Sequence, residues 1–160
     1  MPALSESQPH AGECVFCRIA AGGVEAAVVR RGAHSVVFMD ARPVFKGHAL
    51  VIPLDHLRTL ADVPDTQLGP FMADVRAVSA AVPVAFGAQG SFVAMNNIVS
   101  QSVPHLHVHV VPRTKGDGLR GFFWPRTRYQ DPLEAAGYAE RLAVALTDAD
   151  AAPGAVDSRA

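Results

Sequence analysis

The sequence has almost no net charge and no long apolar run. Its 160 residues include 14 Lys and Arg and 15 Asp and Glu, which leaves a formal net charge of −1 with histidine neutral. A chain without excess positive charge creates no field that attracts polyanions, so general nucleic-acid binding is not expected. Pro, Gly, Asn, Gln and His interrupt the apolar stretches, and none reaches the about 20 residues that a membrane span needs. With 49% hydrophobic residues, the chain is expected to form a soluble globular domain.

Cysteine is also scarce, and the N-terminal residues lack the features of a targeting signal. They have neither the basic start nor the apolar core of a secretory signal, which predicts a cytoplasmic protein without disulfides. The only two cysteines, Cys14 and Cys17, form a C-x-x-C pair. In a reducing compartment such a pair is either half of a metal site or a redox dithiol, and the pair alone does not decide between them.

Hydrophobic periodicity divides the chain into short strands, two helices and aperiodic ends. Residues 1–12 and 149–160 are expected to be disordered tails, and residues 13–148 one folded domain. The patterns predict strands at 28–31, 35–40, 48–53, 91–96 and 105–111, and helices at 65–82, ended near Pro83, and at 133–146. This order indicates an α+β fold, in which helices cover one face of an antiparallel sheet of about five strands.

The predicted strand at 105–111 carries three histidines in strict alternation with apolar residues. Side chains alternate between the faces of a strand, so His105, His107 and His109 would share one face, which is unusual for purely structural residues. Two chemistries remain open: a metal centre of three histidines, or a nucleophilic histidine flanked by donors that bind a phosphate. Neutral donors nearby favour the second. They include His48, Asn96, Gln101 and Ser102.

At this point the sequence resembles a known family. The segment QSVPHLHVHVVPR is similar to the hallmark of the histidine triad (HIT) nucleotide-binding superfamily, His-x-His-x-His preceded by Gln-Ser or Gln-Thr. The segments CVFCRI, VVFMDARPVFKGHALVIPLDH and MNN agree with the family in the same order, so the resemblance covers residues 14–113. The loop NIVSQ, residues 97–101, is shorter than in the family and lacks its glycines, which bears on substrate choice.

The resemblance implies a HIT-like fold and hydrolysis or transfer at the α-phosphorus of purine nucleotide phosphoramidates or dinucleoside polyphosphates. The reaction would pass through a nucleotidyl-histidine intermediate and would require no catalytic metal. The implied catalytic residues are His107 as nucleophile, His109, His48 and Ser102. The implied nucleotide-binding residues are Asp40 at the ribose, Asn96, Gln101, Ser102, His107 and His109. The alternative is a nucleotide-binding or signalling module with the same fold and little turnover, and the base, the leaving group and the acceptor stay open.

The C-x-x-C pair finds two candidate partners in His56 and His105. Together with Cys14 and Cys17 they make a Cys₂His₂ set, which is typical of structural zinc because it leaves no open position on the metal. A subset of similar proteins has such a site. A redox pair and unliganded thiols are the alternatives. Members of the family are commonly homodimers, and the helix at 65–82 or the strip at 122–124 can supply that interface.

Overall fold

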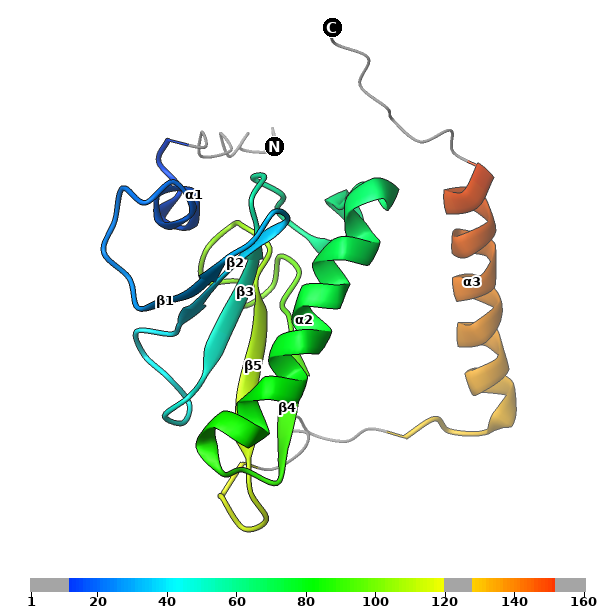
Figure 1. Ribbon diagram of the computed structural model, residues 1–160. Helices are drawn as coiled ribbons and strands as arrows, with labels where there is room; N and C mark the ends of the chain where they lie inside the picture. The colour runs from blue at the N-terminus through cyan, green and yellow to red at the C-terminus, as the bar shows by residue number, and fades with distance from the viewer. Residues whose placement is uncertain (1–11, 120–127, 152–160) are drawn as a thin grey trace, which may run out of the picture. The chain divides into compact units, whose positions relative to one another are not determined.

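The computed structural model describes residues 12–119 and 128–151, which belong to two compact units divided after Leu119 (Figure 1). The strip at 122–124 and most of the two predicted tails lie outside the described residues. In the first unit the strands are β1 (Val28–Arg31), β2 (Ser35–Met39), β3 (Ala49–Pro53), β4 (Gly90–Ala94) and β5 (Val108–Arg113). Its helices are α1 (Val15–Ala20), the 3₁₀ turn η1 (Leu60–Asp62) and α2 (Asp65–Phe86). In the second unit, α3 (Pro132–Ala151) is the described helix.

The five strands form one antiparallel sheet in the order β1-β2-β3-β5-β4. This confirms the predicted α+β class and the expected number of strands. The helix predicted at 65–82 continues past Pro83 to Phe86 and ends at Gly87, which takes a left-handed backbone with φ of 63°. Glycine adopts this conformation without steric cost, so it ends the helix, whereas Pro83 is accommodated inside it.

The histidine segment enters the sheet later than predicted. Regular pairing begins at Val108 rather than at His105, because the preceding residues bond to loops instead of to a neighbouring strand. The amide of His105 donates to the carbonyl of Val103, and the amide of Leu106 donates to that of Leu57. The predicted alternation nevertheless holds, since Leu106 and Val108 are fully buried in the core on one side of the chain.

Both faces of the sheet are covered, so the prediction that helices cover one face is wrong. Helix α2 packs Phe71, Val75 and Val82 on one face, where Val51 and Val108 are buried. The short helix α1 covers the other face. There Phe16 and Ile19 pack with Val36, Phe38, Leu50 and Ile52. Six residues give too little periodicity to predict α1 from the sequence.

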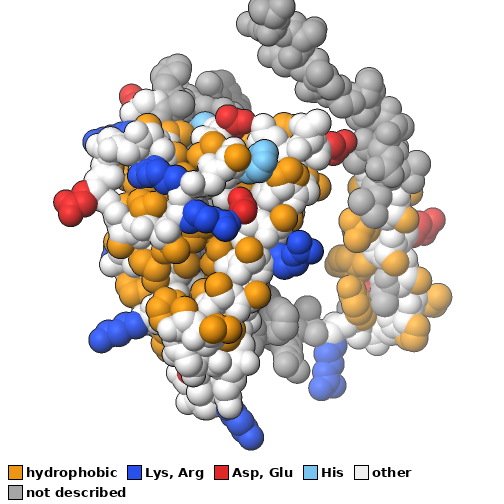
Figure 2. All heavy atoms as spheres, in the orientation of Figure 1, with side chains coloured by type: hydrophobic (Ala, Val, Ile, Leu, Met, Phe, Trp, Pro, Cys, Tyr) orange, Lys and Arg blue, Asp and Glu red, His pale blue; other side chains and the backbone are white. Residues whose placement is uncertain are grey.

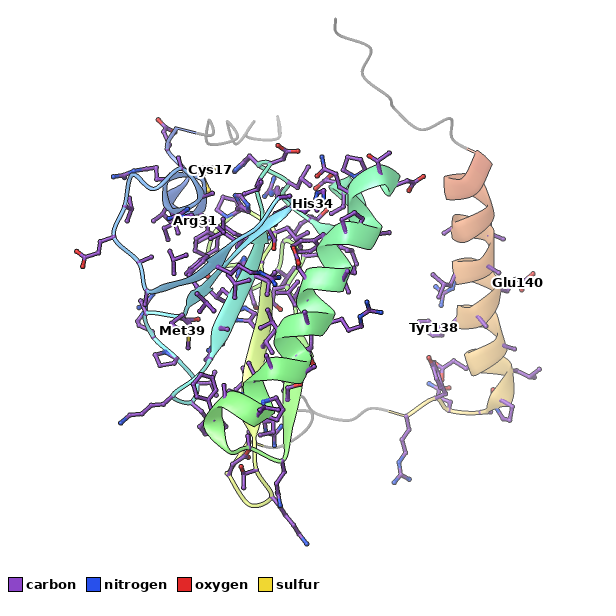
Figure 3. The ribbon with its side chains drawn as sticks, viewed as in Figure 1. Cys17, Arg31, His34, Met39, Tyr138 and Glu140 are labelled. Atoms are coloured by element: carbon purple, nitrogen blue, oxygen red, sulfur yellow. The ribbon has the colours of Figure 1, made fainter. Side chains whose placement is uncertain are left out.

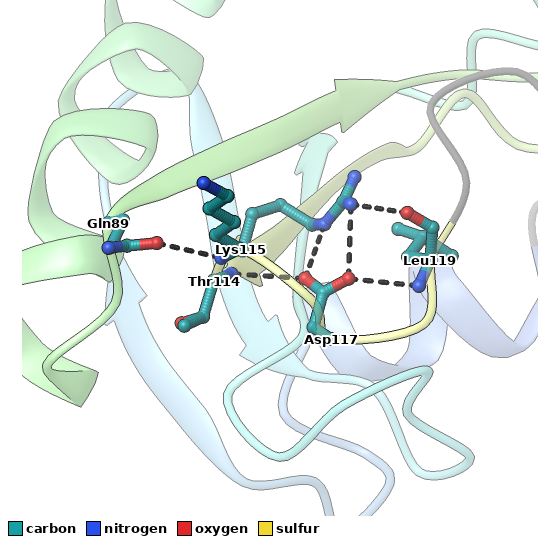
Figure 4. Close-up of polar contacts among 6 residues, drawn as sticks. Gln89, Thr114, Lys115, Asp117 and Leu119 are labelled. Carbon is teal, nitrogen blue, oxygen red and sulfur yellow. Dashed lines mark hydrogen bonds and ion pairs between the residues drawn. The ribbon is translucent and has the colours of Figure 1, made fainter.

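One group of hydrogen bonds holds the C-terminal end of α1 against β1, and a second holds the turn that follows β5. Arg31 on β1 donates hydrogen bonds to the carbonyls of Ile19 and Ala20 at the end of α1, at 2.9 and 2.7 Å. After β5, the guanidinium of Arg113 binds Asp117, whose carboxylate also accepts from the amides of Thr114 and Leu119 (Figure 4). The hydrogen bonds from Arg113 lower the pKa of Asp117 to about 2, so this network stays charged at neutral pH.

Helix α2 is long and apolar enough to cross a membrane by length and composition, and among the described residues it is the one helix that is. It contacts β3, β4 and β5, and 17% of its apolar window is buried. Basic side chains on the face shown in Figure 2 lie among apolar and acidic ones, as the small net charge predicts.

In the second unit, Tyr138 of α3 packs against Tyr129 and lies under the guanidinium of Arg141, 4.2 Å from the ring centre.

Candidate functional site

His107 is held by its own backbone neighbourhood with one ring nitrogen free. Its Nδ1 lies 2.7 Å from the carbonyl oxygen of His105, an acceptor only, so Nδ1 carries the proton. In the neutral tautomer that this hydrogen bond selects, the other nitrogen, Nε2, keeps its lone pair. The ring is 1% exposed and packs edge-on against Phe16 and His109, with ring centres 5.2 and 5.0 Å away. An oriented, unprotonated imidazole nitrogen of this kind is suited to nucleophilic attack.

A chain of hydrogen bonds fixes the proton on His109 as well. The backbone amide of Val44 donates to Nδ1 of His48 at 3.2 Å, so the proton of His48 is on Nε2. That Nε2 lies 2.9 Å from Nδ1 of His109 and donates to it. His109 must then carry its own proton on Nε2, which becomes a donor. The result is a donor beside the free nitrogen of His107, a pairing that suits an oxyanion.

Burial keeps these histidines neutral. Burial, followed by the neighbouring His107 and His48, lowers the pKa of His109 to about 4, while Asp40 opposes the shift. Burial also lowers the pKa of His48, again against the raising effect of Asp40. At neutral pH both rings therefore act as uncharged donors and acceptors, which the hydrogen-bond chain requires.

We expect acid to destabilise the protein more than it destabilises a His109→Gln variant. The pKa of His109 falls from 6.5 to about 4 on folding, so between these values the unfolded chain binds a proton that the folded protein does not. Stability is therefore lost as the pH falls through this window, and the effect of His109 is absent above it. Urea titrations at about pH 7, 6 and 5 should give a steeper loss of unfolding free energy for the unmodified protein. Equal slopes would contradict a depressed pKa.

A cavity of about 600 Å³ opens beside His107 and His109. His107, His109 and Ser102 line it, and Asp40 contributes a carboxylate to its wall. Apolar side chains line much of the rest, among them Phe16, Ile19, Phe38 and Leu50. The Oδ1 atom of Asp40 accepts from the amide of Arg42 at 2.8 Å, and its Oδ2 atom lies 3.6 Å from Nδ1 of His48. The cavity thus combines an apolar wall, a carboxylate and a cluster of donors, as a site for a nucleoside phosphate would.

Asn96, Gln101 and His48 do not line this cavity, whereas Asp40, Ser102, His107 and His109 do. His48 reaches the site through its hydrogen bond to His109. The side-chain amide of Asn96 donates to the backbone carbonyl of Ser100 at 3.1 Å. The side-chain amide of Gln101 donates to the backbone carbonyl of Arg58 at 2.6 Å. In this structure both side chains hold the loop rather than face the cavity. Their assignment to nucleotide binding stays a prediction.

The loop that lacks glycines takes left-handed backbone conformations without them. Ile98 has φ of 71° and Ser100 has φ of 60°. A β-branched residue rarely adopts such angles, and the strain must be offset by the surrounding contacts. These include a hydrogen bond from the amide of Leu60 to the side chain of Asn97 at 2.8 Å. The absence of glycines was visible in the sequence, but the left-handed conformations of Ile98 and Ser100 were not.

Three further residues position the site and were missed by sequence reasoning. Phe16, between the two cysteines, contacts His107, and Val44 fixes the proton of His48. Phe86 lies against Gly47, where an added Cβ would be 2.6 Å from the ring and where φ is 97°. Only glycine fits there, so Gly47 brings the loop before His48 against the end of α2. The lone glycine before His48 was the one signal in the sequence.

Cys14, Cys17, His56 and His105 come together as predicted, with one ligand atom of each within 4.8 Å of the others. The Sγ atoms lie 3.2 to 3.6 Å from the histidine Nδ1 atoms that they contact. A tetrahedral zinc ion with bonds near ~2.3 Å to sulfur and ~2.1 Å to nitrogen separates the two by roughly 3.6 Å. The Nε2 atom of His105 donates to the carbonyl of Pro53 at 3.1 Å, which leaves Nδ1 as the ligand atom. The donor set therefore fits zinc.

Cys17 lies on α1, beside the sheet (Figure 3). Burial, followed by the effects of Cys14, raises the pKa of Cys17 to about 11. In the absence of a cation the thiol therefore keeps its proton, and a bound metal would be needed to displace it. A second group, formed by Asp40, His48 and His109, also places ligand atoms within 4.8 Å of one another. Its two histidines are hydrogen-bonded to each other, so a metal bound there would have to break the hydrogen bond between His48 and His109.

Comparison with known proteins gives consistent matches. The model of the HIT domain family matches residues 22–116. The chain is 32% identical over 114 residues to adenosine 5′-monophosphoramidase hnt1 of Schizosaccharomyces pombe, covering 70% of this chain and 83% of the relative. It is 29% identical to adenylylsulfatase HINT3 of Arabidopsis thaliana, covering 71% and 59%. It is 35% identical to the asymmetrical bis(5′-nucleosyl)-tetraphosphatase of Schizosaccharomyces pombe, covering 52% and 47%.

Solved structures give the same answer at the level of the fold. A HIT-family protein of Bacillus subtilis aligns with a TM-score of 0.72 at 30% identity, covering 82% of this chain and 95% of that one. A zinc-bound histidine triad protein of Mycobacterium smegmatis aligns with a TM-score of 0.64 at 32% identity, covering 88% and 99%.

Proposed function

The chain belongs to the HIT domain family, and on that premise we propose that it is a nucleotide hydrolase or transferase acting at an α-phosphorus. Its substrates would be purine nucleotide phosphoramidates or dinucleoside polyphosphates. The observation that carries the proposal is the hydrogen bond from Nδ1 of His107 to the carbonyl of His105, which leaves Nε2 unprotonated at the edge of the cavity. Relatives named as a phosphoramidase, an adenylylsulfatase and a tetraphosphatase support the reaction class.

The reaction would proceed in two displacements on His107. In the first, the Nε2 lone pair forms a bond to the α-phosphorus while the bond to the leaving group breaks, and the leaving group takes that electron pair and a proton from solvent. In the second, water or phosphate attacks the same phosphorus, the bond to Nε2 breaks with its electron pair returning to the ring, and an attacking water releases a proton to solvent. The Nε2 proton of His109 and the hydroxyl of Ser102 would stabilise the charge on the phosphoryl oxygens. His48 holds His109 in the required protonation state.

The cavity would bind the nucleoside portion of the substrate. Phe16, Phe38 and Leu50 offer apolar surface for a purine, and Asp40 would accept hydrogen bonds from the ribose hydroxyls. Oδ1 of Asp40 accepts from the amide of Arg42 and Oδ2 lies 3.6 Å from Nδ1 of His48, so Oδ2 would be the oxygen that accepts from the ribose. These contacts are the same in the ground state and the transition state, and so they set affinity rather than rate.

We expect Asp40→Ala to raise KM several-fold and to leave kcat nearly unchanged, because the ribose contact is uniform along the reaction. Asp40→Asn keeps the volume and one acceptor oxygen, so its effect should be smaller. Steady-state kinetics with an adenosine phosphoramidate measures both constants. A fall in kcat alone would show instead that Asp40 acts through the neighbouring His48.

The rival hypothesis is a nucleotide-binding or signalling module that turns over little. A panel separates the two: adenosine and guanosine phosphoramidates, adenylyl sulfate, and diadenosine tri- and tetraphosphates, each with and without added phosphate. A burst of acid-labile nucleotidyl-protein supports the enzyme. Equal inactivity toward every compound, with nucleotide still bound, would establish the module. The oriented ring of His107 favours catalysis, because a pure binder does not need a ring nitrogen held toward the phosphorus.

We also propose that the group Cys14, Cys17, His56 and His105 holds structural zinc. Four protein ligands leave no position for substrate, so the metal would supply rigidity and not Lewis-acid catalysis.

For the expected homodimer we propose the outer face of α2 as the interface, since Leu68 and Met72 are each 38% exposed and Phe86 is 50% exposed. A cytoplasmic location and the absence of nucleic-acid and membrane partners stay predictions.

A further inference from the structure

A second cavity, of about 330 Å³, lies beside the loop that leads to the histidines. It is lined by His56, Leu57, Arg58, Thr59, Asp62 and Ile98. All but Ile98 come from the segment between β3 and α2, and Ile98 comes from the loop before Ser102. The proposed reaction gives this cavity no role.

Arg58 has an unsatisfied group in this region. Its Nε atom is buried and has no hydrogen-bond partner, and in the part of the chain that the structure describes it is the one buried side-chain nitrogen or oxygen without a partner. Buried polar groups are nearly always paired, and a charged donor without an acceptor is especially unfavourable. A guanidinium in this state is suited to donate hydrogen bonds to the oxyanion of a ligand.

The same loop connects the two cavities. The carbonyl of Arg58 accepts a hydrogen bond from Gln101 at 2.6 Å, and the next residue, Ser102, lines the first cavity. Ile98, at the other end of the loop, lines the second. A substrate whose nucleoside fills the first cavity has its α-phosphorus at His107 and Ser102. Its leaving group must extend beyond that phosphorus, and the hydrogen bond from Gln101 to Arg58 joins the loop at the phosphorus to the lining of the second cavity.

The remaining side chains of the second cavity limit the charge that it takes. The amide and hydroxyl of Thr59 both donate to Oδ2 of Asp62, at 2.8 and 2.7 Å, which fixes this carboxylate in the turn η1. Asp62 forms no ion pair with Arg58 within the described residues, so the guanidinium is not neutralised. One fixed negative charge nevertheless disfavours a multiply charged group. A singly charged oxyanion fits this balance best.

We propose that the second cavity is a leaving-group subsite, in which Arg58 binds a singly charged oxyanion such as a carboxylate or a sulfate. This inference rests on the proposed function, since it identifies the leaving group of the same reaction. Substrates with an oxyanion on the leaving group are then used more efficiently than neutral ones. The contact does not involve the second displacement, because the leaving group has departed by then.

A matched pair of substrates tests the subsite: AMP joined through nitrogen to glycine, and AMP joined in the same way to glycinamide. They differ in one carboxylate. We expect the unmodified protein to prefer the glycine compound, and Arg58→Gln to lower its kcat/KM by roughly 10- to 100-fold while leaving the glycinamide compound unchanged. Adenylyl sulfate tests the sulfate in parallel. Arg128→Gln, a change of an exposed arginine that lies outside α2 and does not line either cavity, is the matched control and should alter none of these rates.

The outcomes separate this proposal from the proposed function. Loss of activity toward glycine and glycinamide compounds alike, in an Arg58→Gln protein with unchanged melting temperature, would overturn the subsite. If Arg58→Gln does not fold, the unmodified protein still decides, since equal kcat/KM for the two compounds overturns the subsite without any variant. A loss confined to the carboxylate or to the sulfate supports the subsite and identifies its anion. Failure of the unmodified protein to cleave any compound would instead refute the proposed function.

Discussion

His107→Ala should lose at least ~3 orders of magnitude in kcat and still bind nucleotide, because the covalent route needs the Nε2 lone pair. The free nitrogen exists only because the carbonyl of His105 holds the proton on the other side of the ring. Removal of the ring leaves His48, Asp40 and the apolar wall of the cavity in place. Binding of AMP, measured by calorimetry, should therefore persist. Acid-labile label from a substrate radiolabelled at the α-phosphorus should disappear.

The matched control for this prediction is His34→Ala. His34 is exposed at the turn between β1 and β2, away from the cavity-lining residues (Figure 3). Its loss should change neither the rate nor the label. A near-normal rate in a pure His107→Ala preparation would rule out the nucleotidyl-histidine mechanism. Loss of both rate and binding, with an altered melting temperature, would show that the ring is needed for the fold, since it packs edge-on against Phe16.

Much of the fold followed from local patterns, whereas several contacts within the site did not. The five strands and α2 carry regular periodicity over enough residues to be read from the chain alone. Helix α1 was missed because six residues hold less than two full turns of pattern. The start of β5 was misplaced because pairing with β3, which begins at Val108, depends on the partner strand and not on the alternation itself.

The chemistry of the site shows the same division. The histidines and the C-x-x-C pair were visible as residue types at fixed spacings, and Asp40 was assigned from the family resemblance. The hydrogen bond from Val44 to His48 and the contact of Phe16 with His107 join segments brought together only by folding. The unpartnered Nε of Arg58 is likewise a property of packing, since nothing in its sequence neighbourhood distinguishes it from a solvated arginine. Sequence patterns thus predicted which groups are present, and the fold decides their protonation and partners.

The proposed zinc site connects α1 to His107, the proposed nucleophile, through two routes. His105 contributes Nδ1 to the cluster, and its backbone carbonyl binds the proton of His107. Phe16, between Cys14 and Cys17, packs its ring against both His105 and His107. A metal that fixes the two thiolates would therefore fix one wall of the cavity as well. Loss of the metal should loosen this wall without removing the reacting nitrogen.

The purified protein should accordingly contain about one zinc per chain, and a Cys14→Ser/Cys17→Ser variant should lose the metal together with thermal stability. Metal content by mass spectrometry of the elements and the melting temperature by calorimetry measure the two effects. Hydrolysis should remain measurable in the variant, because His107 is intact. Its KM should rise, because the cavity wall that includes Phe16 is no longer held in place.

The unmodified protein after removal of metal by a chelator is the matched control, and its melting temperature should approach that of the variant. Full metal content in the variant would contradict the ligand assignment. Hydrolysis that strictly requires added zinc would point instead to a catalytic metal bound by the histidines.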